Sequence, residues 1–350
     1  ICGRCAEVCP TVAILKEDAT KHLIFSQIDC TNCGNCISVC PSGALDYTLM
    51  PQSSFATIAK LYKGKIPLIV PEEMSLDELN VSLPENVLPF AISAAHFLSQ
   101  THFLTLLQES GSSVILYSKS LGKGEKDAIS ILNQIYGLKF KESAIYHAKD
   151  RAELESALKK AKLIDGSQHS MTEYALPKRE IFAKRLEFIV GESDLGVVKS
   201  GEMIRYGEVT INADTCTLCL SCVGACNVSA LVADKKTNSI LFNPSVCTAC
   251  GYCELSCAEK NTISLEVGKL ALKPEFFVYS ELAHDELFAC VECGKEFATK
   301  KAVEKIAAIM QPRFGNDRAK IKSLYCCADC KAKIMVQAQL NAMREDLLNG

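Results

Sequence analysis

Twenty cysteines, gathered into a few short groups, are the residues whose type and spacing indicate chemistry in this chain. The pattern Cys-x2-Cys-x2-Cys-x3-Cys recurs along it. A four-iron four-sulfur (4Fe–4S) cluster needs four thiolates at the corners of a tetrahedron, and such a run supplies three from one tight loop. Disulfides are disfavoured, because these cysteines lie two residues apart in a chain of 350 residues and not scattered through a short secreted one.

The cysteine groups form an internal repeat with an offset of 217 residues. Adding 217 to each cysteine of the first group gives a cysteine of the second group in seven of seven cases, and Ile24 falls on Leu241. Only Cys216 lacks a counterpart, which would lie two residues before Ile1. We therefore expect the natural chain to begin further upstream, with a cysteine at that position and a strand matching residues 206–211.

Each copy of the repeat resembles a bacterial two-cluster ferredoxin, most clearly in the run CTNCGNCISVCP at 30–41. The resemblance implies that the last cysteine of each run crosses to the other cluster of its module. Four 4Fe–4S clusters are then implied. Their ligands would be Cys2, Cys5 and Cys40 for the first, Cys9, Cys30, Cys33 and Cys36 for the second, Cys216, Cys219, Cys222 and Cys257 for the third, and Cys226, Cys247, Cys250 and Cys253 for the fourth.

Residues 41–215 contain no cysteine and predict a separate domain. Short apolar runs at 66–70 and 114–117 are typical of buried parallel strands. Apolar residues at helical spacing predict two helices between and after such strands; they are Ala128, Ile131, Leu132, Ile135 and Leu138, then Leu154, Ala157, Leu158 and Ala161. This alternation predicts a small parallel sheet covered by helices.

Two weaker features of this middle region have ordinary interpretations. The segment 122–124, Gly-Lys-Gly, lacks the pattern of a phosphate-binding loop and is interpreted as a surface turn. His96 and His102 lie six residues apart on a predicted helix, which puts them on different faces, so we interpret them as partly buried histidines and not as ligands.

The C-terminal region carries a second kind of cysteine pattern around a predicted helix at 301–310. Two Cys-x2-Cys pairs resemble a structural zinc site, with Cys290, Cys293, Cys327 and Cys330 as ligands. Rubredoxin-like iron and free or catalytic thiols are the alternatives. Cys326 competes for the third position, but Cys327 keeps the two-residue gap to Cys330 and is preferred.

These patterns predict an α+β multidomain protein. Two ferredoxin-like modules, at 1–50 (truncated) and 201–270, flank a small α/β parallel-sheet domain at 55–200, and a helical zinc-ribbon-like region with four cysteine ligands occupies 275–350. The net charge of −3 gives no basic stripe for nucleic acid. No stretch approaches the ~20 apolar residues of a membrane helix, and this many reduced thiols favours the cytoplasm.

Electron relay is the function that these features favour. The whole chain resembles polyferredoxins that serve oxidoreductases such as formate dehydrogenases or hydrogenases, which would be its redox partners. One alternative is an electron-input subunit whose α/β domain binds a flavin or nucleotide, although no nucleotide fingerprint is present. A second alternative is a maturation or docking factor for another redox enzyme, acting through its C-terminal cysteine region.

Overall fold

The computed structural model describes residues 2–17, 19–20, 22–74, 81–94, 96–171 and 176–349. The chain forms two compact units. The first comprises Ile1–Glu208, Asn243–Cys250 and Glu266–Val278, and the second comprises Val209–Phe242, Gly251–Leu265 and Tyr279–Gly350. Because the two units divide the second ferredoxin-like segment between them, the four predicted domain boundaries stay a prediction.

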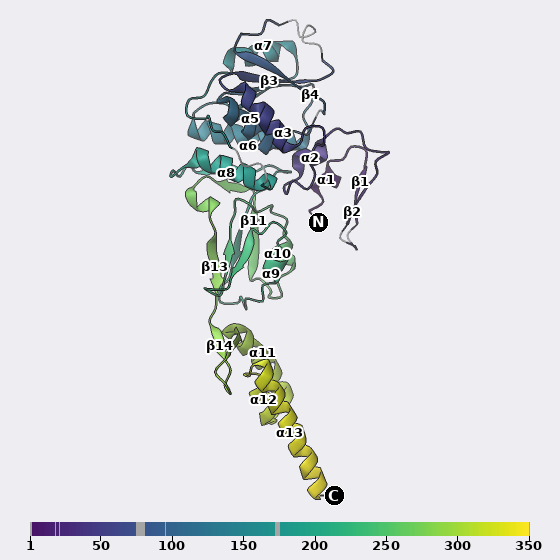
Figure 1. Ribbon diagram of the computed structural model, residues 1–350, viewed down its shortest axis with the longest axis vertical. Coiled ribbons are helices and arrows are strands. Elements are labelled where there is room, and N and C mark those ends of the chain that lie inside the picture. Colours follow the sequence, from purple (N-terminus) through teal and green to yellow (C-terminus); the bar gives the residue numbers. More distant parts are fainter. Residues whose placement is uncertain are drawn as a thin grey trace. The chain divides into compact units, whose positions relative to one another are not determined.

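A parallel four-stranded sheet forms the middle of the first unit, as the apolar runs predict (Figure 1). The strand order is β4-β3-β5-β6, with bounds Val87–Ile92, Ile66–Pro71, Val114–Tyr117 and Ile145–Ala148. Strand β3 is buried along almost its whole length, because both faces of the sheet are covered.

Helices cover the two faces of this sheet unequally. Helices α3 (Gln52–Ala59), α5 (Gln100–Ser110), α6 (Lys123–Lys139) and α8 (Lys178–Val190) share one core with Ile69 of β3, and α7 (Arg151–Lys160) shares the opposite core with Leu68. The predicted apolar faces lie in α6 and α7, but Leu138 is 37% exposed near the end of α6. A short 3-10 helix, η1, follows α3 at Lys60–Tyr62.

Of the two weaker interpretations, the surface turn is wrong, and the histidine interpretation holds for the partly buried His96 but not for the predicted helix or for His102. The segment 122–124 begins helix α6, and Gly124 is buried against α2 (Asn35–Val39), where an added Cβ would lie 2.5 Å from Ser38 Oγ. This close packing against the cysteine-bearing segment replaces the predicted surface turn. His96 precedes helix α5 and does not lie on it, whereas His102 lies in its first turn and is almost fully buried.

The 217-residue repeat extends to the secondary structure. In the first copy, α1 (Arg4–Glu7), β1 (Ile14–Glu17), β2 (His22–Phe25) and α2 (Asn35–Val39) follow one another. In the second, α9 (Ser221–Gly224), β9 (Leu231–Asp234), β10 (Ser239–Phe242) and α10 (Tyr252–Leu255) start at the same positions plus 217. Each copy therefore folds as two cysteine-bearing helical turns with an antiparallel hairpin between them.

Further strands complete the two units. Strand β8 (Gly207–Ile211), on the segment expected to be a strand, pairs with β11 (Ile263–Val267), and β7 (Val197–Lys199) pairs with β12 (Lys269–Ala271). The 3-10 helix η2 (Pro274–Phe277) follows β12, and β13 (Ser280–His284) joins β10.

The C-terminal region lies wholly in the second unit. It consists of the hairpin β14 (Leu287–Ala289) and β15 (Glu296–Thr299), then α11 (Lys300–Phe314), α12 (Arg318–Ser323) and α13 (Ala328–Asn349). The predicted helix at 301–310 corresponds to α11. Within the described part of the chain, none of the helices has the length and apolar character needed to span a membrane.

Candidate metal centres

Residues with left-handed backbone conformation recur in the cysteine loops. Gly3 (φ 73°) and Leu220 (φ 60°), 217 residues apart, precede α1 and α9. Gly34 (φ 84°) and Gly251 (φ 80°) precede α2 and α10 in the same way. A left-handed residue reverses the chain sharply, which lets the cysteines before and after it face a common centre. At Leu220 this conformation costs ~1–2 kcal/mol, because only glycine adopts it freely.

The predicted second site is a cavity of about 480 Å³ in the first unit. All four of its predicted ligands line it: Cys9, Cys30, Cys33 and Cys36. The amide of Ala13 donates to Cys9 Sγ over 3.2 Å. Burial raises the pKa of the Cys36 thiol, and the neighbouring sulfurs of Cys33 and Cys30 raise it further. The four thiolates therefore need a bound cationic partner to ionise together, which is the condition that iron supplies.

Three cysteines of the chain are predicted for the first site, and helices α1 and α2, which carry or adjoin them, contact each other. Burial raises the pKa of Cys5 to about 11, and the charges of Cys2 and Cys40 raise it further. Cys5 and Cys40 are buried and Cys2 is exposed. The fourth ligand predicted for this site lies before Ile1 and outside the chain.

In the second unit, the predicted third site is a smaller cavity of about 20 Å³. It too is lined by all of its predicted ligands, Cys216, Cys219, Cys222 and Cys257. Burial raises the pKa of Cys222 to about 11, followed by the charge of Cys216. As in the first module, the thiols oppose one another's ionisation and the donor set fits an iron–sulfur cluster.

The predicted fourth site has ligands in both compact units. Cys247 and Cys250 belong to the first unit, and Cys226 and Cys253 belong to the second. Each loop shows the amide-to-sulfur contacts typical of cluster loops, since Ala249 N donates to Cys247 Sγ and Leu231 N to Cys226 Sγ, both over 3.4 Å. The ligand set of this site stays a prediction.

The C-terminal cysteines converge on one point. The sulfurs of Cys290, Cys293, Cys327 and Cys330 all lie within 4.8 Å of one another. Gly294 (φ 73°) donates from its amide to the Cys290 carbonyl over 2.8 Å and closes the turn of the first pair. The fold thus assembles the four residues predicted for the zinc site, and their geometry suits a single metal ion.

Electrostatics distinguish two of the C-terminal cysteines. Burial raises the pKa of Cys290, but amide donors, first that of Cys327, outweigh it and hold the pKa at about 6. The Sγ of Cys326 donates to the Lys322 carbonyl over 3.3 Å, and burial, followed by the neighbouring Cys290, raises its pKa to about 11. Cys327, and not Cys326, belongs to the set of four sulfurs that lie within 4.8 Å of one another.

Sequence reasoning missed the buried cations beside the cysteine loops. Arg4 is 2% exposed and donates from Nη2 to the carbonyls of Thr248 and Ala249, over 2.8 and 3.3 Å. Lys178 at the start of α8 donates to the Ile37 carbonyl over 2.6 Å. One signal was available for Arg4, because the repeat has a serine at the corresponding position, 221.

Comparison with known proteins defines the class. Residues 1–44 and residues 208–258 each match a family model described as a 4Fe-4S dicluster domain. These two modules make the chain an iron–sulfur electron-transfer protein. The polyferredoxin-like subunit of an aliphatic sulfonate oxidoreductase from Pyrococcus furiosus is 42% identical over 48 residues, 13% of this chain and 28% of the relative. With this similarity, the two modules support a polyferredoxin.

Proposed function

We propose that the chain is a polyferredoxin that relays single electrons between redox proteins through four 4Fe–4S clusters. The clusters, when bound, supply the one-electron chemistry, and the chain holds, spaces and partly buries them. The proposed ligands are the fifteen ferredoxin-type cysteines named above. The C-terminal four-cysteine site binds zinc, which stabilises a region whose own hydrophobic core is small.

The contact of Arg4 with Thr248 is the observation that carries this proposal. Arg4 lies between Cys2 and Cys5 of the first module, and Thr248 lies between Cys247 and Cys250 of the second, all within the first compact unit. A direct hydrogen bond of 2.8 Å between the two loops supports electron transfer from one module to the other inside a single chain. Two independent ferredoxins joined by a linker would not need such a contact.

A reductive titration of the anaerobically reconstituted chain tests the relay. Each 4Fe–4S cluster accepts one electron, so the four clusters should take up about four electrons per chain. Removing one ligand of the second site, with Cys36→Ser, should lower the uptake by about one electron and the iron content by about four atoms. Cys326→Ser, in the C-terminal region, is the matched control and should change neither. An uptake of two electrons, or the spectrum of a 2Fe–2S centre, would contradict four cubanes.

The partner is proposed to be the catalytic subunit of an oxidoreductase. Formate dehydrogenases and hydrogenases are candidates from the family resemblance, and the name of the relative adds a sulfonate oxidoreductase. Four clusters of about −2 each would move the net charge from −3 to about −11, so a basic docking surface is expected on the partner. Co-purification from the native organism identifies it, and turnover should fall as salt rises. Salt-independent turnover would argue against this mode of docking.

A further inference from the structure

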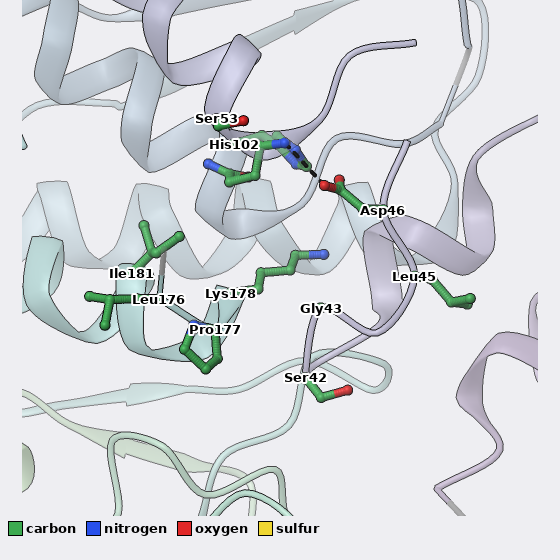
Figure 2. Close-up of a pocket in the computed structure, with 11 residues that line it drawn as sticks. Ser42, Gly43, Leu45, Asp46, Ser53, His102, Leu176, Pro177, Lys178 and Ile181 are labelled. Carbon is green, nitrogen blue, oxygen red and sulfur yellow. Dashed lines mark hydrogen bonds between the residues drawn. The ribbon is translucent and has the colours of Figure 1, made fainter. Parts of the chain in front are cut away.

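A cavity of about 170 Å³ lies next to the second cysteine site, whose cavity is also lined by Leu45 and Asp46, and has no cysteine in its own lining (Figure 2). Asp46 comes from the segment after Cys40, Gln52 from α3, His102 from α5 and Lys178 from α8, and all belong to the first compact unit. Because a water molecule occupies about 30 Å³ of liquid, the cavity has room for an organic molecule of roughly six heavy atoms.

His102 presents a fixed hydrogen-bond donor to this cavity. Its Nδ1 accepts from the amide of Ser99 over 3.2 Å, so in the neutral ring the proton lies on Nε2. Burial keeps the ring neutral by holding its pKa well below 6.5, with the charge of Lys178 as the second cause. The side chain is 1% exposed, yet its Nε2 has no hydrogen-bond partner among the described residues. An unpaired buried donor is costly, which makes this atom a point for ligand recognition.

Besides the hydroxyl groups of Ser42 and Ser53, the other polar groups that line the cavity are one cation, one carboxylate that already accepts hydrogen bonds, and one amide oxygen without a partner. Lys178 contributes its ammonium group, and Figure 2 shows it extending into the space that His102 and Asp46 also face. The two oxygens of Asp46 already accept from the amides of Tyr47, over 2.9 Å, and Gln52, over 3.3 Å. Gln52 Oε1 is buried and has no partner in the described part of the chain. Leu176 and Ile181 lie together and give the cavity an apolar side (Figure 2).

We propose that this cavity binds a short hydroxy-carboxylate. The carboxylate would pair with the ammonium group of Lys178 and accept from His102 Nε2, and the hydroxyl would donate to Gln52 Oε1. The short carbon chain would contact Leu176 and Ile181. A ligand of this class satisfies both orphaned buried atoms at once, whereas an anion without a hydroxyl group, such as chloride or sulfate, offers no donor to Gln52, and a neutral alcohol offers no charge to Lys178.

Binding at this site would change the electrostatics of the neighbouring cluster sites. The Lys178 ammonium donates to the carbonyl of Ile37, the residue after Cys36, and the charges of Cys40 and Cys36 act on it. A bound anion would offset this cation and make electron uptake by the adjacent clusters less favourable. By reciprocity, reduction of those clusters would weaken binding. This second statement, unlike binding itself, rests on the proposed relay function.

Equilibrium dialysis of the cluster-loaded full chain against labelled lactate, at constant ionic strength, tests the site. We expect one saturable equivalent, with lactamide, which lacks the charge, and propionate, which lacks the hydroxyl, each binding at least tenfold more weakly. Equal retention of lactate and lactamide would overturn the proposal.

Two neighbouring serines of α3 provide a matched pair of variants. Ser53 lines the cavity and Ser54 does not, and both are exposed, so neither substitution disturbs the core. Ser53→Leu should block the cavity and reduce lactate binding at least tenfold, and Ser54→Leu should bind as the parent chain does. Unchanged binding by Ser53→Leu would place the ligand elsewhere and refute the site.

A third variant tests the charge directly. Lys178→Met should abolish binding, and Lys159→Met, on the exposed end of α7, should not. The iron content of each variant shows whether its clusters remain. A potentiometric titration followed by electron paramagnetic resonance (EPR) then tests the coupling: lactate should lower the midpoint potential of a first-module cluster in the parent chain and not in Ser53→Leu. Binding without any shift would refute the coupling and leave the site established.

Discussion

The guanidinium group of Arg4 donates from Nη2 to the carbonyl oxygen of Thr248 over 2.8 Å and so joins cysteine loops that lie 244 residues apart in sequence. Burial lowers the pKa of Arg4, and the charges of Cys2 and Cys250 act in the opposite direction. Its Nη1 has no hydrogen-bond partner among the described residues. A buried cation with spare donors between two sets of thiolates is stabilised when those thiolates are ionised, as they are around iron.

Replacing Arg4 should therefore change the redox potentials on both sides of it. Arg4→Met removes one buried positive charge and should shift the potentials of the first and fourth clusters to more negative values by ~60 mV, about a tenfold change in a one-electron equilibrium. Arg4→Lys keeps the charge and should shift them less. EPR-monitored redox titration measures both variants. Arg313→Met, which removes an exposed arginine, is the control, and an equal shift there would rule out a local effect of Arg4.

Gly34 should be required for the second cluster for a steric reason. It has φ 84°, and a Cβ at this position would lie 2.6 Å from the backbone nitrogen of Phe97. Gly64 has a similar φ of 71°, but an added Cβ there meets nothing within 4 Å. Both alanine variants should lose ~1–2 kcal/mol of stability from the backbone conformation alone.

The close approach to Phe97 should make the Gly34 variant differ from the Gly64 variant. Gly34 also lines the cavity of the second site, so Gly34→Ala should lose more stability than Gly64→Ala and about four iron atoms per chain. Denaturant unfolding and iron analysis measure the two effects. Equal losses in both variants would show that the contact with Phe97 is relieved without disturbing the site.

Local patterns predicted the parts of the fold that depend on local sequence. The buried strands β3 and β5 were predicted because apolar runs of this kind have few alternatives. Strand β4 was not, because Pro89 interrupts its apolar run. Its position at the edge of the sheet explains how the proline is tolerated. Helix α8 was also missed, because the charged Arg185 lies on its buried face. An ion pair of 2.8 Å with Glu109 and a hydrogen bond of 3.1 Å to Gln108 Oε1 stabilise that burial.

In the candidate sites too, features set by local sequence could be predicted, and contacts between segments far apart in the sequence could not. The spacing of the C-terminal cysteines was enough to predict that they converge, since two tight turns bring each pair together. The buried cations could not be predicted from local spacing, because Lys178 donates to the carbonyl of Ile37, which lies 141 residues away in the sequence. Contacts over such distances follow from how α8 packs and leave no local pattern in the sequence.

His102 should make stability depend on pH. Burial, and then the charge of Lys178, holds its folded-state pKa well below 6.5, so below this value the unfolded chain binds the proton more readily. The contribution of the neutral His102 ring to the free energy of unfolding is therefore fully present above about pH 6.5 and declines as pH falls towards the folded-state pKa. His102→Gln should flatten the decline between pH 7 and 5, measured by urea unfolding, while the difference between the two proteins stays constant above pH 7.5. A parallel decline in both would assign the effect to other groups.

Cys293 and Cys326 should differ in their effect on the C-terminal metal, although both are cysteines of the same region. The sulfur of Cys293 lies 3.7 Å from that of Cys327 and belongs to the converging set of four. The sulfur of Cys326 instead donates to the carbonyl of Lys322. Cys293→Ala should remove one of four zinc ligands, and Cys326→Ala should remove none.

Metal analysis and limited proteolysis of the full chain distinguish the two variants. The parent chain should hold about one zinc ion, and Cys293→Ala should lose it and become sensitive to protease within 275–350, because metal binding there is folding free energy. Its visible absorbance and iron content should stay at the parent level, since the ferredoxin-type cysteines are intact. Cys326→Ala should keep its zinc and its resistance. If Cys293→Ala loses iron in place of zinc, the C-terminal four-cysteine site is a fifth iron centre of the rubredoxin kind. Electron transfer, as well as the folding of residues 275–350, would then depend on this site.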